Sequence, residues 1–220
     1  MRRLFILRPE PGASETLEKA RSLGIDAVAA PLFKIEPVEW DAPEASSFDA
    51  LLVTSANTIR NAGEKLKNYR GLAVHAVGAA TADAARQAGF NIASSGDSGV
   101  DRLLRSIDPD AILLHLGGED RRKPADARQS ITFVTLYRTV PLGPDLSGIA
   151  GAVAMIHSPG AAQRLGELIS GQRRASVRIA AISKAAAEAA GEGWKCVEHA
   201  KEPSDSALLA LAARLCEKQD

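Results

Sequence analysis

The sequence has few of the residues that mark several protein classes. Its only cysteines, Cys196 and Cys216, form no CxxC pair, so we expect neither a disulfide framework nor a zinc site, and a reducing compartment fits best. Aromatic residues make up 4% of the chain, which disfavours nucleic-acid modules that stack bases. Lys plus Arg equals Asp plus Glu at 27 each, so no net charge points to nucleic acid or to a membrane surface.

Long apolar runs are lacking as well. The stretch MRRLFILRPEPG holds only four consecutive apolar residues before Arg8, which is too short for a signal-peptide core. No run approaches the ~20 apolar residues of a membrane-spanning helix. We therefore expect a cytoplasmic protein without a membrane segment.

What the sequence has is a regular alternation of short apolar runs and helical patterns. With 220 residues, of which 45% are hydrophobic, it can form one large domain or two small ones. Near-continuous apolar strands suit a parallel sheet covered on both faces, and a pattern such as SETLEKARSLG (14–24) suits a helix that ends at Gly24. The strand candidates are 4–7, 27–30, 50–53, 73–77, 111–116, 152–156 and 178–182. This alternation predicts doubly wound, flavodoxin-like α/β units.

Two β-rich segments, PLFKIEPVEW (31–40) and ITFVTLYRTVP (131–141), interrupt the alternation. As a pair of antiparallel strands they would form a two-stranded ladder between two lobes. The predicted organisation is a discontinuous first lobe (1–33 and 142–220), bridging strands (34–40 and 131–141) and an inserted second lobe (41–130).

An internal repeat supports two lobes. DALLVTSANTIRNAGEKL, LAVHAVGAATADAARQAGF and SGVDRLLRSI correspond in order to GAVAMIHSPGAAQRLGELI, VRIAAISKAAAEAAGEGW and SDSALLALAARL. Ser55 and Ser158 are 103 positions apart, and Gly89 and Gly193 are 104 apart, so small differences in loop length explain the drift. Three matched blocks in the same order are hard to obtain by chance.

Four loops could carry chemistry: RPEPGAS (8–14), TSAN (54–57), VGAAT (77–81) and HSPG (157–160). In an open parallel sheet, ligands bind where strands end and helices begin. Helix N-termini offer free N–H groups and partial positive charge, which suit carboxylates and phosphates. The small residues in these loops would let a ligand approach the backbone.

Each candidate residue also has a structural interpretation. Ser55 and Asn57 can be N-caps that contribute ~1 kcal/mol without any ligand. Gly78 can be a packing glycine and Thr81 a cap. Arg8 can anchor an anion or form a surface salt bridge.

The histidines and the remaining basic residues also have either a structural or a functional interpretation. His75 and His115 lie within strand patterns and are expected to be core or edge residues, whereas His157 directly precedes the second serine loop. Tyr137 alternates with Phe133 and is expected to pack. The basic residues of GGEDRRKPAD form either a solvated loop or a binding loop; they are Arg121, Arg122 and Lys123.

No Ser/His/Asp order, metal-ligand spacing, Walker-type loop or GxGxxG fingerprint is present. On their own, the residues thus predict a two-lobed α/β protein with a ligand cleft between the lobes.

The whole chain resembles the uroporphyrinogen-III synthase family. The stretches that carry the resemblance are ILRPEPGASETLEKARSLGIDAVAAPLFKIEP, DALLVTSANTIRNA, AVHAVGAATADAARQAGF, ILLHLGGEDRR, VTLYRTVP, MIHSPGAAQRL, IAAISKAAAEAAGEGW and EPSDSALLALAARL. The resemblance implies two α/β lobes joined by a two-stranded ladder, a monomer, and no cofactor or metal. It also implies a lyase that cyclises the linear tetrapyrrole hydroxymethylbilane to uroporphyrinogen III, with inversion of the last ring and loss of water.

That reaction needs few strong catalysts. The substrate is a flexible chain rich in carboxylates, and loss of its hydroxyl gives an azafulvene that cyclises spontaneously without inversion. The enzyme must favour attack at the substituted carbon of the last ring through a spiro intermediate, which is mainly control of proximity and orientation. Protonation of the leaving hydroxyl is a smaller contribution.

By this resemblance, residues from both lobes would bind the substrate: Arg8, Ser55, Asn57, Gly78, Thr81, Ser158 and Pro159. The second G-x-x-T-A loop reads ISKAAA here, so Ser183 and Ala186 replace the glycine and threonine. His157, Ser183 and Lys184 are the candidates for proton donation. A catalytically degenerate, regulatory module that binds an anionic metabolite is the alternative, and a sugar- or phosphate-binding protein is a third.

Overall fold

The computed structural model describes residues 1–96, 99–120 and 124–217. The chain folds as two compact units. The first unit comprises Met1–Lys34 and Val140–Asp220, and the second unit comprises Ile35–Thr139. Arg121, Arg122 and Lys123 lie outside the described residues.

The first unit contains a five-stranded parallel sheet in the order β11-β10-β9-β1-β2. Its strands are β1 (Leu4–Ile6), β2 (Ala27–Ala29), β9 (Val153–Ile156), β10 (Arg178–Ala181) and β11 (Cys196–His199). Taken in chain order, they occupy the positions of the flavodoxin-like sheet, 2-1-3-4-5. β1 and β9 lie at the centre, so the loops that follow them begin at the middle of the carboxyl edge.

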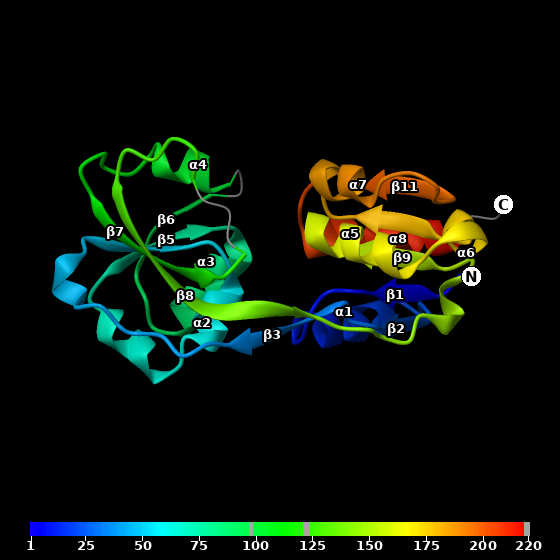
Figure 1. The fold of residues 1–220 in the computed structure, drawn as a ribbon, viewed down its shortest axis with the longest axis horizontal. Coiled ribbons are helices and arrows are strands. Elements are labelled where there is room, and N and C mark those ends of the chain that lie inside the picture. Colours follow the sequence, from blue (N-terminus) through cyan, green and yellow to red (C-terminus); the bar gives the residue numbers. More distant parts are fainter. Residues whose placement is uncertain (97–98, 121–123, 218–220) are drawn as a thin grey trace. The chain divides into compact units, whose positions relative to one another are not determined.

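Helices cover both faces of this sheet (Figure 1). Successive side chains of a strand point to opposite faces, so Leu4 and Ile6 pack with α1 (Gly12–Ser22) and α8 (Asp205–Glu217). Phe5 and Leu7 face the other way and pack with α5 (Pro159–Leu168) and α7 (Lys184–Ala190). A short helix, α6 (Gly171–Ser176), leads into β10.

The second unit is built on a six-stranded sheet in the order β3-β8-β7-β4-β5-β6. Its strands are β3 (Phe33–Pro37), β4 (Ala50–Val53), β5 (Ala73–Val77), β6 (Ile92–Gly96), β7 (Ile112–Gly118) and β8 (Ser130–Pro141). The pairs from β8 to β6 are parallel. At the edge, Val38 N donates to Leu136 O at 2.9 Å and Leu142 N donates to Leu32 O at 2.8 Å, so β3 runs antiparallel to β8.

The two faces of the second sheet are covered unequally. One face packs against α2 (Ala56–Asn61), α3 (Ala79–Gln87) and a 3-10 turn over Glu64–Tyr69. The other face packs against the short α4 (Val100–Leu104) and forms a smaller apolar cluster. Between β7 and β8, residues 119–120 and 124–129 contain no helix, whereas α1 connects the corresponding strands β1 and β2. Further 3-10 turns occupy Ala45–Ser47 and Ser147–Ile149.

The predicted fold class is confirmed. All seven strand candidates are strands, and β3 and β8 form the two-stranded ladder through which the chain passes between the units. The repeat corresponds to β4–α4 and β9–α8, which follow the same strand order in their two sheets. β8 also pairs with β7 up to Tyr137, so much of this strand belongs to the second sheet. The prediction missed β6 and β11, which are short, partly polar edge strands without an apolar run.

Within the described ranges, no helix combines the length and apolarity that a membrane crossing requires. The same residues contain no group of three or more His, Cys, Asp or Glu side chains that could hold a metal ion.

Candidate functional site

The loops that follow the parallel strands hold the candidate residues. In the second unit they form a pocket of about 210 Å³, lined by Thr54, Ser55, Gly118, Asp120, Tyr137 and Thr139. Thr54 and Ser55 follow β4, Gly118 ends β7 and Asp120 follows it, and Tyr137 and Thr139 lie on β8. The pocket is therefore at the carboxyl edge of the sheet, where doubly wound folds bind their ligands.

Ser55 both caps a helix and lines this pocket. Its backbone is extended, and its Oγ accepts a hydrogen bond from Asn57 N at 3.2 Å at the start of α2. The capping interpretation of Ser55 is therefore confirmed. Asn57 is not a cap, because its amide is the donor and its carbonyl accepts a bond from Asn61 Nδ2 at 2.8 Å.

Tyr137 is a pocket residue that the sequence analysis did not identify. Its side chain packs in the core as expected, but it also lines the pocket beside Gly118, its neighbour across the sheet. A Cβ at Gly118 would lie 2.6 Å from Cε2 of the Tyr137 ring, so only glycine lets the ring occupy this place. In the sequence, Gly118 at the end of β7 is the feature that could have revealed the place of Tyr137 in the pocket.

Two histidines of the second unit are structural, as expected. His115 is fully buried on β7, and its Nε2 lies 3.2 Å from Thr54 Oγ1, beneath the pocket. His75 lies on β5, where its Nδ1 is 2.7 Å from Ser94 Oγ. Burial lowers the pKa of His75, which favours the neutral imidazole.

Gly78 is the N-cap of α3, so the loop that contains it leads into a second helix N-terminus of this unit. Its φ of 87° is in the region that favours glycine, and a Cβ there would meet no atom within 4 Å. The amides of Thr81 and Ala82 donate to the Gly78 carbonyl, so the first two amides of α3 precede the helical bonding pattern. Thr81 itself is only 4% exposed.

In the first unit, Arg8 is fixed rather than solvated. Its Nη1 donates to Asp205 Oδ2 at 2.5 Å and to Thr16 Oγ1 at 3.4 Å. The guanidinium lies over Gly12, where a Cβ would come within 2.5 Å of Arg8 Nε. This arrangement leaves 24% of the Arg8 side chain exposed.

His157 lies against the same carboxylate. Its Nε2 is 3.4 Å from Asp205 Oδ1, and its side chain is 10% exposed. Within the described part of the chain, Nδ1 has no hydrogen-bond partner and Nε2 has only this contact with Asp205. Burial lowers the pKa of His157 and the Arg8 charge adds to this, while Asp205 opposes both. The His157 imidazole and the Arg8 guanidinium in turn hold the pKa of Asp205 well below its usual range.

The second serine loop repeats the first one. Ser158 caps α5 by accepting a hydrogen bond from Ala161 N at 3.2 Å, and Pro159 occupies the first helical turn, where its missing N–H has no consequence. Both the cap and the extended backbone match Ser55. The residues that matched between the two copies of the sequence therefore occupy matching structural positions.

Ser183 and Lys184 differ from their counterparts in the second unit. Ser183 caps α7 by accepting from Ala186 N at 3.3 Å, which is a side-chain cap at the place where the second unit has Gly78. Lys184 is exposed and lies 3.6 Å from Glu188 on the same helix. Proton donation by these two residues stays a prediction.

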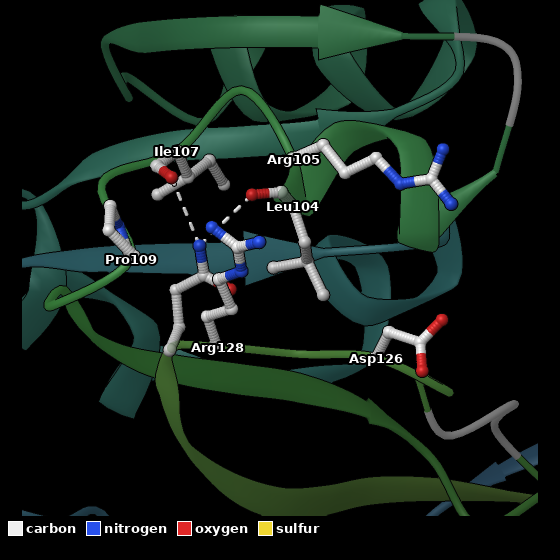
Figure 2. Close-up of a pocket in the computed structure, with 7 residues that line it drawn as sticks. Leu104, Arg105, Ile107, Pro109, Asp126 and Arg128 are labelled. Atoms are coloured by element: carbon white, nitrogen blue, oxygen red, sulfur yellow. Dashed lines mark hydrogen bonds between the residues drawn. The ribbon is translucent and has the colours of Figure 1, made fainter.

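A larger hollow, of about 490 Å³, lies away from these loops (Figure 2). It is bordered by Leu104, Ile107, Pro109 and Arg128, which precede β7 and β8 and so lie toward the amino edge of the sheet. There, Gln129 Nε2 donates to the carbonyls of Leu104 and Ile107 at 3.0 Å and closes the end of α4. The candidate residues lie at the carboxyl edge instead, where doubly wound folds bind their ligands.

Comparisons with known proteins decide the family. The family model described as uroporphyrinogen-III synthase HemD matches residues 14–210, which is most of the chain. The chain belongs to the uroporphyrinogen-III synthase family. The predicted family is thereby confirmed, the chain is assigned to a family of enzymes, and nothing favours the regulatory alternative.

Solved structures agree with the synthase family at the level of the fold. The uroporphyrinogen-III synthetase of Helicobacter pylori is similar at 16% identity and a TM-score of 0.68, over 98% of this chain and 100% of that one. A mutant uroporphyrinogen III synthase of the extremely thermophilic bacterium Thermus thermophilus is similar at 20% identity and a TM-score of 0.61, over 100% of both chains. No curated protein sequence matches this synthase-family chain.

Proposed function

We propose that the chain is a uroporphyrinogen-III synthase that cyclises hydroxymethylbilane to uroporphyrinogen III. The reaction inverts the last pyrrole ring and releases water, which makes the enzyme a hydro-lyase. The observation that carries the proposal is the family match over residues 14–210. The helix entrances at the carboxyl edges of both sheets support it, because they suit a substrate rich in carboxylates.

Substrate binding would rest largely on backbone amides and short polar side chains. Ser55 and Asn57 begin α2, Gly78 and Thr81 begin α3, and Ser158 and Pro159 begin α5. Amides at such helix ends donate to carboxylates and carry partial positive charge. Fixed carboxylates would hold the tetrapyrrole in the fold that brings the substituted carbon of its last ring to the azafulvene.

Loss of the hydroxyl requires a proton donor. His157 is one candidate, but burial lowers its pKa and leaves the imidazole largely neutral near pH 7, so few molecules carry the proton to be donated. The Tyr137 phenol lines the pocket of the second unit together with Ser55 and is a further candidate beside Ser183 and Lys184. A donor of either kind would transfer its proton to the leaving oxygen as the C–O bond breaks, so that water departs.

We further propose that the two compact units are the two lobes of the synthase, with residues 34–40 and 131–141 as the connection. A cytoplasmic location is supported by Cys196 and Cys216, neither of which forms a disulfide bond within the described residues. The family resemblance leads us to expect a monomer, which sedimentation equilibrium measures directly.

Isomer analysis tests the proposed reaction. Purified protein is supplied with hydroxymethylbilane, the products are oxidised, and the porphyrin isomers are separated by chromatography. We expect type III porphyrin to exceed the enzyme-free background in proportion to protein concentration. Type I porphyrin alone, at the background rate, would refute the enzyme.

A further inference from the structure

The carboxylate of Asp205 joins two side chains that leave different strands. Arg8 follows β1 and His157 follows β9, and these strands are neighbours in the sheet. One oxygen, Oδ2, accepts a hydrogen bond from Arg8 Nη1, and the other, Oδ1, faces His157 Nε2. A single carboxylate thus fixes the separation of two cation-capable groups at the centre of the carboxyl edge.

Asp205 is itself held firmly. It is the first residue of α8, where a negative charge is favourable near the helix N-terminus. The preceding residue, Ser204, caps the helix by accepting from Ala207 N at 3.2 Å, and its carbonyl accepts from Leu208 N at 3.0 Å. Leu208 is fully buried, so the turn that carries Asp205 is anchored in the core.

Residues of α1 fix the Arg8 side chain as well. The guanidinium lies in the space that Gly12 leaves by lacking a side chain, and Thr16 contacts Nη1 from α1. Only Nη1 of this guanidinium has partners among the described residues, although the group carries five N–H donors. Donors on Nε and Nη2 are therefore not used within the described protein.

His157 gives an independent reason to expect a ligand here. A buried polar group without a hydrogen-bond partner is costly, and native structures rarely keep one without a functional reason. Nδ1 of His157 is in this state among the described residues, and Nε2 has only its 3.4 Å contact with Asp205, although the side chain is nine-tenths buried. The cluster of Arg8, Asp205 and His157 thus combines fixed geometry with unused hydrogen-bonding capacity.

We propose that Asp205 is a positioning residue of the synthase, which holds Arg8 and His157 in the arrangement that receives a carboxylate of the tetrapyrrole. The inference rests on the proposed function and adds to it a residue that contacts the substrate only through its two partners. A fixed guanidinium binds a carboxylate with less loss of side-chain freedom than a mobile one. Asp205 therefore acts mainly on substrate binding.

The test compares Asp205→Asn with Asp26→Asn. Asp26 pairs with Arg3 Nε at 2.9 Å beside the amino ends of β1 and β2, so its substitution removes an acid–arginine pair from the opposite edge of the same sheet. We expect Asp205→Asn to raise KM for hydroxymethylbilane about tenfold, with kcat for type III product within about twofold. Asp26→Asn should change neither constant.

A second readout does not depend on turnover. The groups that face His157 are Asp205 on α8 and Arg8 after β1, and Asp205 opposes the lowering of the His157 pKa. In an NMR titration of the ring protons, Asp205→Asn should therefore shift the His157 pKa further down, whereas Asp26→Asn should not. A purely structural role for Asp205 would lower the melting temperature without moving KM.

The outcomes separate the two proposals. An active wild type with an unchanged KM in Asp205→Asn would overturn this inference alone. A lower KM would also overturn it, because Asp205 would then compete with the substrate for Arg8. A wild type that makes no type III product would refute the proposed function and, with it, the role of the cluster in substrate binding.

Discussion

The two units repeat one β–α arrangement but provide different chemistry at the carboxyl edge. In the second unit the edge presents mostly uncharged groups, namely the Ser55 hydroxyl, the N-terminus of α3 after Gly78 and the Tyr137 phenol, together with one carboxyl group, Asp120. In the first unit it presents ionisable side chains held together, namely Arg8, His157 and Asp205. The caps Ser55 and Ser158 are common to both copies and so serve the fold as well as the proposed substrate binding, whereas the residues that differ are where we expect the two units to act differently.

The units also differ in how their sheets are covered. The face of the first sheet that packs on α1 and α8 has a large apolar cluster, while the corresponding face of the second sheet packs on α4 alone. The connection from β7 to β8 contributes no helix among its described residues. We infer that the second unit relies more on close contacts within its sheet, such as that between Gly118 and Tyr137.

The largest effect is expected from Gly118→Ala in the second unit. The new Cβ would lie 2.6 Å from the Tyr137 ring, so the ring must leave its place in the pocket. We expect a loss of about 1–3 kcal/mol in the free energy of unfolding, together with a loss of type III product. Chemical denaturation and isomer analysis measure the two effects.

Gly71→Ala is the matched control, because a Cβ at Gly71 meets no atom within 4 Å. It should leave both stability and product unchanged. If Gly118→Ala were as stable and active as Gly71→Ala, the close contact between Gly118 and Tyr137 would matter neither for stability nor for activity.

Gly78 and Ser183 are the N-caps of the corresponding helices α3 and α7, and exchanging their residue types is expected to affect stability unequally. Gly78 has a φ of 87° and a ψ of 144°, a conformation that is strained for any residue but glycine, so Gly78→Ser should destabilise the protein by about 1–3 kcal/mol. Ser183 is extended and caps α7 with its side chain, so Ser183→Gly should cost only a few tenths of a kcal/mol. Urea denaturation of both variants measures the difference, and equal losses would show that the two entrances are interchangeable.

The two caps Ser55 and Ser158 should contribute equally to stability, and Ser55 should contribute to activity as well. Ser55→Ala and Ser158→Ala each remove one cap bond of 3.2 Å, and each should lower the free energy of unfolding by ~1 kcal/mol. Combining Ser55→Ala with Asn57→Ala should reduce type III formation by more than its effect on stability explains. Parallel losses of activity and stability would assign Ser55 and Asn57 to the fold alone.

The smallest effect concerns pH. Burial lowers the pKa of His157 below the ~6.5 of an unperturbed histidine, so the unfolded chain binds more protons than the folded chain just below that pH. The stability contributed by the neutral imidazole is thus complete above about pH 6.5 and decreases as the pH falls further. His157→Asn should make the melting temperature depend less steeply on pH between about 5 and 6.5.

His75→Asn provides the comparison in the second unit. Burial lowers the pKa of His75 too, but this side chain is only half-buried, so its substitution should flatten the curve less. If the melting temperature depended on pH equally steeply in the wild type and in His157→Asn, the loss of stability at acid pH would not be due to His157.

The sequence predicted most of the fold because apolar runs and their spacing are set by the sheets themselves. Buried parallel strands such as β4 and β9 consist wholly of buried residues, which makes them visible as runs. Edge strands are paired on one side only, so β6 and β11 can hold polar residues and leave no such run. Segment β8 was recognised as a strand, but its pairing with β7 was not, because pairing depends on residues distant in sequence.

The candidate site was predictable where it depends on local structure. Ser55, Gly78 and Ser158 stand directly at strand-to-helix turns, and their neighbours in sequence reveal these turns. Asp205 was not identified from the sequence, because its role depends on its hydrogen bond with Arg8, which is distant in the sequence. Tyr137 was identified only as a packing residue, because its contact with Gly118 comes from the register of two strands.

Labelling of the substrate tests the central claim, ring inversion, most directly. Hydroxymethylbilane would carry carbon-13 at both its hydroxymethyl carbon and the free α carbon of its last ring. Closure without inversion joins these two carbons directly, whereas closure at the substituted carbon keeps them apart. We predict that the enzymatic product shows no one-bond carbon–carbon coupling between the labels, and a coupled pair as abundant as in the enzyme-free product would contradict the account.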